Sequence, residues 1–185
     1  TLYAQVLAME EPDARATRLT LNNLAAIFLE KGEYQAAAEL FNRLLAIDPE
    51  DVAGLNGLGL AMQSTRDWNG AMALYRRAIM LAPNNADLHS NLGICLTSTG
   101  QFDEAQAALE QAVALLPDAT GFFNLGRLHE VAGRLPQALA CYDQALSIDC
   151  HMVVALIQRG MVQHDMGKDA AAIADLEHAL RIDPS

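Results

Sequence analysis

The 185-residue chain has few of the residues that build sheets, bind nucleic acids or span membranes. Aromatic residues make up 5% of it, and no apolar run approaches the roughly 20 residues of a membrane-spanning helix. Only 12 Lys and Arg stand against 23 Asp and Glu, so the net charge is −11 and argues against binding to phosphates or anionic membranes. Apolar residues still reach 52%, and the abundant alanine favours an all-α protein with a core.

The chain also lacks a disulfide framework and a secretory signal. Its three cysteines, Cys95, Cys141 and Cys150, are an odd number, which fits a reducing compartment, and we expect a cytoplasmic location. The first residue is Thr, so we expect the sequence to be a segment of a longer protein.

An internal period of 33 or 34 residues runs through the chain. The glycines that follow Leu or Arg in four Leu-Gly or Arg-Gly pairs keep this spacing, and so do a row of alanines and a row of prolines. They are Gly59, Gly93, Gly126 and Gly160; Ala37, Ala71, Ala105, Ala138 and Ala172; and Pro49, Pro83, Pro117 and, two repeats further on, Pro184. Because three residue types keep one register, the sequence predicts a repeat protein.

Each repeat is predicted to be a pair of helices. In residues 52–85, apolar side chains recur at helical spacing from Leu55 to Met62 and again from Trp68 to Ile79. Four of the repeats carry a glycine between the two helices, where we expect a positive φ angle to end the first helix: Gly32, Gly100, Gly133 and Gly167. Strand signals are absent.

These positions resemble the pattern of the tetratricopeptide repeat (TPR) family, which is Trp-x2-Leu-Gly-x2-Tyr, then Ala-x3-Phe-x2-Ala, then Pro. Repeat two, for example, carries Leu55, Leu58, Gly59, Ala71, Tyr75, Ala78 and Pro83. The resemblance implies an all-α, right-handed α-solenoid superhelix of antiparallel helix pairs, with the first helix of each pair on its concave wall. It divides the single array into a partial repeat and linker (1–17) and repeats one to five: 18–51, 52–85, 86–118, 119–152 and 153–185.

Repeat five departs from this pattern. Arg159 stands where the other repeats have Leu, and Asp175 stands on the second helix. Many family members have a repeat variant with Arg-Gly in the first helix and Asp in the second. The resemblance therefore implies an Arg159–Asp175 ion pair that links the two helices.

No constellation of catalytic or metal-binding residues is present in the sequence. The five histidines, His89, His129, His151, His164 and His178, never lie at i, i+4 or at metal-ligand spacing from a cysteine. There is no glycine-rich phosphate loop and no nucleophile elbow. We therefore predict a non-catalytic protein with no metal and no cofactor.

The remaining candidate for function is the concave groove implied by the resemblance. One set of groove residues is a row of amides, which can hold the backbone of a peptide: Asn22, Asn23, Asn56, Asn91, Asn124 and Gln158. A second set is an apolar strip, with Arg127 at its edge, which would supply side-chain pockets: Leu60, Ile94, Phe123, Ile157 and Met161. We expect Phe123, Ile157 and Met161 to be exposed. The alternatives are that the amides are merely solvated and that part of the strip is packing between repeats.

The leading interpretation is a protein–protein interaction scaffold that binds an extended or helical segment of a partner. The groove lacks the basic residues with which some family members clamp the C-terminal carboxylate of heat-shock chaperones. Two other interpretations stay open. One is a targeting domain of a larger enzyme resembling the protein O-linked N-acetylglucosamine transferases. The other is a scaffold that self-associates through the repeat ends.

Both ends support the last interpretation, or else flanking sequence that is missing. Residues 2–9 resemble Leu40–Ile47, the second half of a second helix, without the helix that should precede it. At the other end, Ile173, Leu180 and Ile182 would expose an apolar face, although repeat arrays usually need polar caps for solubility.

Overall fold

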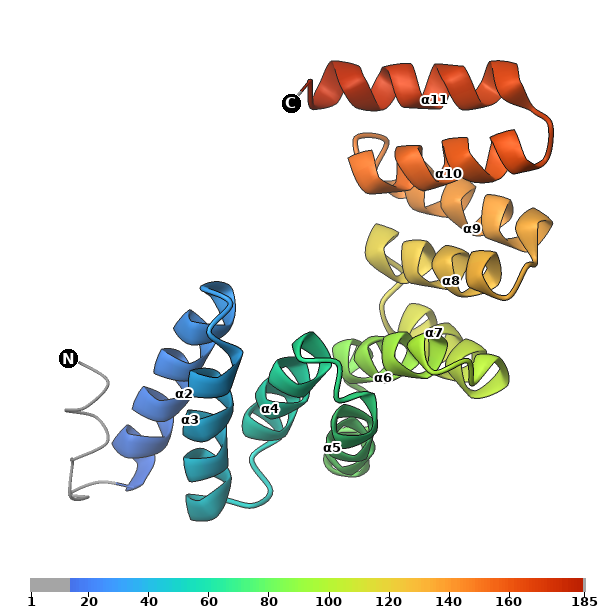
Figure 1. Ribbon diagram of the computed structural model, residues 1–185. Coiled ribbons are helices and arrows are strands. Elements are labelled where there is room, and N and C mark those ends of the chain that lie inside the picture. The colour runs from blue at the N-terminus through green and yellow to red at the C-terminus, as the bar shows by residue number, and fades with distance from the viewer. Residues whose placement is uncertain (1–13, 185) are drawn as a thin grey trace. The chain divides into compact units, whose positions relative to one another are not determined.

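A computed structural model of the chain describes residues 14–184, which form ten α-helices and no strand (Figure 1). This confirms the predicted all-α helical-repeat fold. The helical segment expected at residues 2–9 lies outside the described residues. The helices are α2 (Ala14–Glu30), α3 (Tyr34–Ile47), α4 (Val52–Ser64), α5 (Trp68–Leu81), α6 (Ala86–Ser98), α7 (Phe102–Leu115), α8 (Ala119–Val131), α9 (Leu135–Ile148), α10 (Val153–Asp165) and α11 (Asp169–Ile182).

The chain divides into two compact units, and the division lies between Pro83 and Asn84. Unit 1 contains the antiparallel pairs α2–α3 and α4–α5, and unit 2 contains α6–α7, α8–α9 and α10–α11 (Figure 1). Within each unit, neighbouring pairs pack through the second helix of one pair and the first helix of the next. In unit 2, for example, α10 contacts both α9 and α11. This is the arrangement of stacked repeats, in which no pair buries its apolar face alone.

Glycine in the first helix lets a large side chain of the second helix lie directly against the backbone. A Cβ atom added at Gly126 would lie 2.4 Å from the ring of Tyr142, and one at Gly59 would lie 2.5 Å from the ring of Tyr75. Both tyrosines are fully buried. The repeated glycine is therefore required by close packing, because any larger residue would have to displace the ring.

Side-chain caps fix where several first helices begin. The carboxylates of Asp51 and Asp118 accept hydrogen bonds from the backbone N–H groups of Gly54 and Gly121, at 2.8 Å and 2.7 Å. Asn85 caps α6 in the same way. These residues satisfy N–H groups that have no partner within the helix, so α4, α6 and α8 each start at a defined residue.

The turn between the two helices of each repeat uses the left-handed backbone region. Gly32, Gly100, Gly133 and Gly167 have φ angles of 73° to 76°, as the sequence predicts. In repeat two the same position is held by Arg66, with φ 65°, which is the only positive φ angle of a non-glycine residue among the described residues. Because a Cβ atom makes this region unfavourable, Arg66 is a strained position.

Replacing Arg66 with Gly is expected to stabilise unit 1 by about 0.5–1 kcal/mol, because the gain at positive φ exceeds the entropy that glycine adds to the unfolded chain. Urea denaturation followed by circular dichroism measures the difference. Ser64→Gly is a suitable control, since Ser64 is the last residue of α4 and glycine within a helix should destabilise. If both variants are destabilised, Arg66 is not strained.

Candidate partner-binding face of the first helices

The predicted groove residues all lie on first helices, but they divide between the two units. Four lie in unit 1, on α2 and α4: Asn22, Asn23, Asn56 and Leu60. Eight lie in unit 2, on α6, α8 and α10: Asn91, Ile94, Phe123, Asn124, Arg127, Ile157, Gln158 and Met161. We call the eight positions in unit 2, together with Val154, the first-helix face.

In unit 1, Asn22 lies near a charged cluster. Asn22 is half-buried at the edge of an open hollow that Arg18 also lines. The Arg18 guanidinium lies 2.8 Å from the Asp48 carboxylate and 2.7 Å from that of Asp51. The hydrogen bond to Asp51, and the charge of both carboxylates, raise the pKa of Arg18. This cluster links α2 to the start of α4, and the Arg18 guanidinium is paired with both carboxylates through its Nη2 atom.

The amide row of unit 2 is partly used inside the protein. The side-chain N–H of Asn124 on α8 donates to the hydroxyl of Ser90 on α6, at 3.1 Å. Beside this bond lies a small hollow of about 40 Å³, lined by Ser90, Asp87 and Thr120 among others. Gln158 on α10 makes no such bond among the described residues. Asn124 therefore joins two repeats, while the side-chain amide of Gln158 is not used by the described residues.

The apolar strip is exposed on one helix above all. On α10, Val154, Ile157 and Met161 are all exposed, and their i, i+3, i+7 spacing places them on one face. Ile94 on α6 is half-buried. Val154 was not among the predicted residues, although it lies one helical turn before Ile157. These three side chains form a continuous apolar surface along one face of α10.

The sequence interpretation expected an exposed Phe123, but this side chain is half-buried. Its ring is half-buried and lies 5.8 Å from that of Tyr142, at an interplanar angle of 41°. It packs against the cluster that contains Tyr142 and Val162, and also against the one that contains Leu146 and Leu156. Phe123 on α8 is thus largely a packing residue between repeats four and five.

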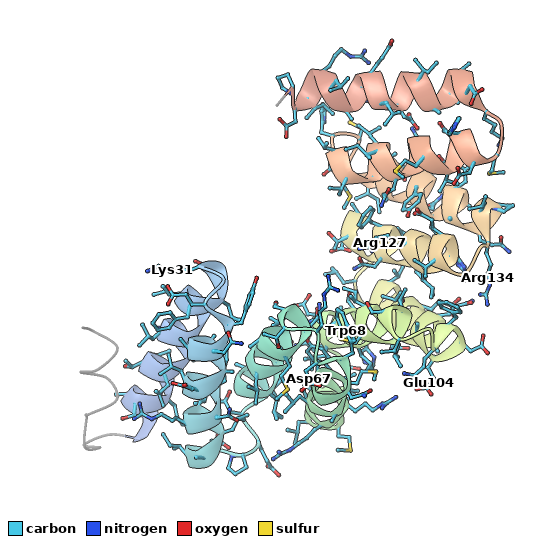
Figure 2. The ribbon with its side chains drawn as sticks, viewed as in Figure 1. Lys31, Asp67, Trp68, Glu104, Arg127 and Arg134 are labelled. Carbon is cyan, nitrogen blue, oxygen red and sulfur yellow. The ribbon has the colours of Figure 1, made fainter. Side chains whose placement is uncertain are left out.

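Arg127 lies exposed on α8, one turn after Phe123 (Figure 2). Its guanidinium has no hydrogen bond or ion pair among the described residues. The neighbouring Glu130 carboxylate accepts a hydrogen bond from the Tyr142 hydroxyl. Burial of that hydroxyl and its bond to Glu130 raise the pKa of Tyr142. Arg127 is therefore an exposed cation of the first-helix face without an ion pair among the described residues.

His164, one residue before the end of α10, is paired within the protein. Its Nδ1 atom lies 2.7 Å from the Asp169 carboxylate, and this contact raises the pKa of the exposed imidazole. The pair lies one helical turn after Met161, so a polar group follows the exposed apolar residues Val154, Ile157 and Met161 along α10.

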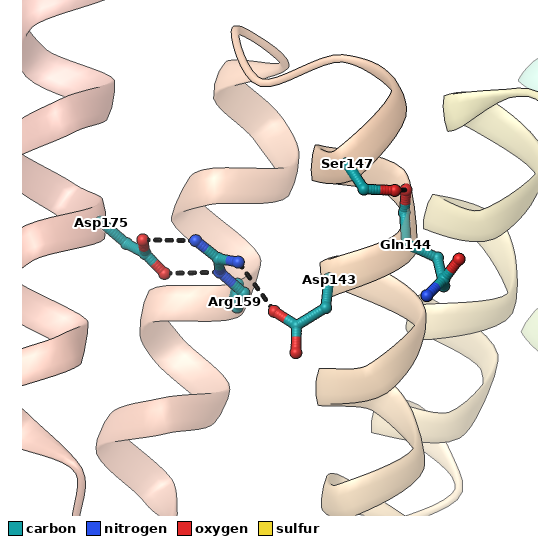
Figure 3. Close-up of polar contacts among 5 residues, drawn as sticks. All are labelled: Asp143, Gln144, Ser147, Arg159 and Asp175. Atoms are coloured by element: carbon teal, nitrogen blue, oxygen red, sulfur yellow. Dashed lines mark hydrogen bonds and ion pairs between the residues drawn. The ribbon is translucent and has the colours of Figure 1, made fainter.

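Arg159 forms the predicted ion pair and a second one that was not predicted (Figure 3). Its Nε and Nη2 atoms donate to the two carboxylate oxygens of Asp175 on α11, each at 2.7 Å. Its Nη1 atom donates to Asp143 on α9, also at 2.7 Å. These bonds and charges raise the pKa of Arg159. One guanidinium therefore connects three consecutive helices, which confirms the pair within repeat five and adds a link to repeat four.

Two further features bear on what the protein can do. Within residues 14–184, no three His, Cys, Asp or Glu side chains are arranged to hold a metal ion. The same part of the chain contains no helix with the length and apolarity needed to traverse a bilayer.

The ten helices of residues 14–184 form antiparallel pairs that stack within each unit, with glycine and alanine at the contacts, and this defines a helical-repeat protein. Models of the tetratricopeptide repeat match residues 19–51, 63–125, 119–151 and 153–185. The chain belongs to the tetratricopeptide repeat family, whose members are generally non-catalytic scaffolds for protein interactions.

The similarity to a curated protein covers a short segment. Neutrophil cytosol factor 2 of Bos taurus is 38% identical over 58 residues, which is 31% of this chain and 11% of that protein. The match thus spans about a tenth of the relative's length.

Solved structures with this fold cover most of the chain. PilF of Pseudomonas aeruginosa has a TM-score of 0.81 at 20% identity, over 91% of this chain and 77% of that one. YrrB, described as a TPR protein with an unusual peptide-binding site, has a TM-score of 0.68 at 21% identity, over 100% of this chain and 94% of that one. At these identities the similarity establishes the fold alone.

Proposed function

We propose that the chain is a non-catalytic interaction module that binds an extended or helical segment of a partner protein on the first-helix face of unit 2. The observation that carries this proposal is the exposed stripe of Val154, Ile157 and Met161 on α10. An apolar surface of this kind is unfavourable in water unless something covers it. The peptide-binding site named for YrrB is consistent with such a use of the fold.

Two polar side chains near the stripe, Gln158 and Arg127, can contact the backbone and the carboxylates of a bound segment. Gln158 can both donate to and accept from a peptide backbone, whatever the sequence of that peptide. Arg127 can pair with a carboxylate of the partner. Residues 84–185 contain 13 acidic and 5 basic side chains, so a partner with a net positive charge would associate faster.

Comparative affinity capture tests this proposal. The chain, the double variant Ile157→Glu/Met161→Glu and the control variant Ile148→Glu would each be used as bait. Ile148 at the end of α9 is as exposed as Met161, so its variant adds a charge to an apolar site outside the first-helix face. We expect proteins that the chain and the control retain to be lost by the double variant, since a carboxylate on the stripe opposes apolar contact.

A captured protein would then be divided into overlapping synthetic peptides to find the bound segment. Circular dichroism should show that all three baits are equally folded. Equal capture by all three would show that the first-helix face does not bind the partner.

A further inference from the structure

Repeat four has a histidine in its core that the proposed function does not use. His129 on α8 is 9% exposed, and within residues 14–184 its Nδ1 atom is buried and has no hydrogen-bond partner. The same register position holds Phe28, Met62 and Leu96 in the first three repeats and Gln163 in the fifth. The imidazole therefore stands at a place that three of the other repeats fill with an apolar side chain.

The structure has no group ready to accept a second proton's hydrogen bond from this imidazole. A neutral ring carries one N–H group, whereas a protonated ring carries an N–H on each nitrogen and a positive charge. At Nδ1 of His129, that N–H group would meet neither a protein acceptor nor water. Because an unpaired charge is costly to bury, the packing of repeat four favours the neutral imidazole.

The charged neighbours of His129 do not compensate for its burial. Arg134, in the turn after α8 (Figure 2), donates from its Nη1 atom to the side-chain oxygen of Gln106 on α7, at 2.9 Å. Gln106 in turn donates to the Glu110 carboxylate, at 2.8 Å. Burial lowers the pKa of His129 and the charge of Arg134 lowers it further, while Glu110 opposes them only in part. The helices α6 and α9 also pack on α8, and no charged group of their described residues acts on His129.

We propose that His129 makes unit 2 sensitive to mild acid, because the unfolded chain takes up a proton at this imidazole and the folded unit does not. Unit 2 would have its full stability above about pH 6.5, the ordinary pKa of histidine. As the pH falls below that value, the unfolded chain binds more protons than the folded chain, and the equilibrium shifts toward unfolding.

The same helix carries part of the proposed binding surface. Phe123, Asn124 and Arg127 of the first-helix face all lie on α8. Mild acid would therefore also release a partner from this face, and this consequence alone rests on the proposed function.

Urea denaturation followed by circular dichroism tests the acid sensitivity, with the unchanged chain and His129→Leu each measured at two pH values. Leucine is suitable because Leu96 holds the same register position in repeat three and is 1% exposed. Between about pH 7.5 and about pH 5.5, the unfolding equilibrium constant of the unchanged chain should rise by up to about tenfold relative to that of the variant. The comparison cancels the groups that titrate alike in both chains.

Two further variants make the result specific. His129→Gln introduces the residue found at this position in repeat five, and it replaces the leucine variant if that variant does not fold. His164→Gln is the control, because Asp169 raises the pKa of the exposed His164 and its effect on stability has the opposite sign. This control should lose at least as much stability in acid as the unchanged chain.

The proposal is overturned if the unchanged chain and the His129 variants lose the same stability between the two pH values. No partner is present in this measurement, so that result would leave the proposed function standing.

Discussion

Replacing Arg159 with Leu should destabilise unit 2 by about 3 kcal/mol, because it leaves the Asp175 carboxylate without its counter-charge. The side chain of Asp175 is only 11% exposed, so water cannot replace the two hydrogen bonds that the guanidinium donates. Leu itself fits the site, since Leu24, Leu58, Leu92 and Leu125 stand at this position in the other four repeats. The loss would therefore come from the unpaired charge.

The double variant Arg159→Leu/Asp175→Ala should recover most of that loss. It gives repeat five the pair found in repeat three, where Leu92 and Ala108 are both buried without charge. A double-mutant cycle measured by urea denaturation gives the coupling between the two residues. Asp143→Asn is the control, and we expect it to cost less than about 1 kcal/mol, since that side chain is 53% exposed. Additive effects of the two substitutions would show that Arg159 and Asp175 act independently.

The fold could be predicted from the sequence because its positions are set by local packing that recurs in every repeat. Gly59 and Gly126 have to be small for Tyr75 and Tyr142 to lie against them, and this requirement is visible as a spacing in the chain. Arg66 breaks the spacing of the turn glycines, yet it adopts the same positive φ angle. The packing of the surrounding repeat thus holds Arg66 in a backbone conformation that non-glycine residues disfavour.

The contacts between repeats were harder to predict, because they depend on how one helix pair is rotated on the next. Asp143 lies 16 residues before Arg159, just as Asp175 lies 16 residues after it. The family pattern indicates only the second of these pairs, since that pair lies within one repeat. The hydrogen bond from Asn124 to Ser90 spans 34 residues, and it engages one N–H group of a predicted site residue within the protein.

Phe123 is another residue whose contacts with the next repeat could not be predicted from the sequence. Its replacement is expected to have the second large effect on stability. Replacing Phe123 with Ala should destabilise unit 2 by about 2–3 kcal/mol, less than the loss for a fully buried ring because the side chain is half-buried. The substitution opens a cavity beside Tyr142 and removes contacts to α10 residues in both clusters. The loss would appear as a lower urea midpoint for the unfolding of unit 2.

Met161→Ala is the matched control, since Met161 is also apolar and on the strip but is 52% exposed on α10. We expect it to change stability by less than about 0.5 kcal/mol, as surface substitutions usually do. Phe123 thus tests the role of the apolar strip in packing between repeats, and Met161 tests its role as an exposed surface. If Phe123→Ala were as stable as the unchanged chain and lost only the captured partner, the ring would be a binding anchor after all. Destabilisation by Phe123→Ala alone would instead mean that Phe123 holds repeats four and five together, and that the exposed stripe of α10 is the part of the strip left for a partner.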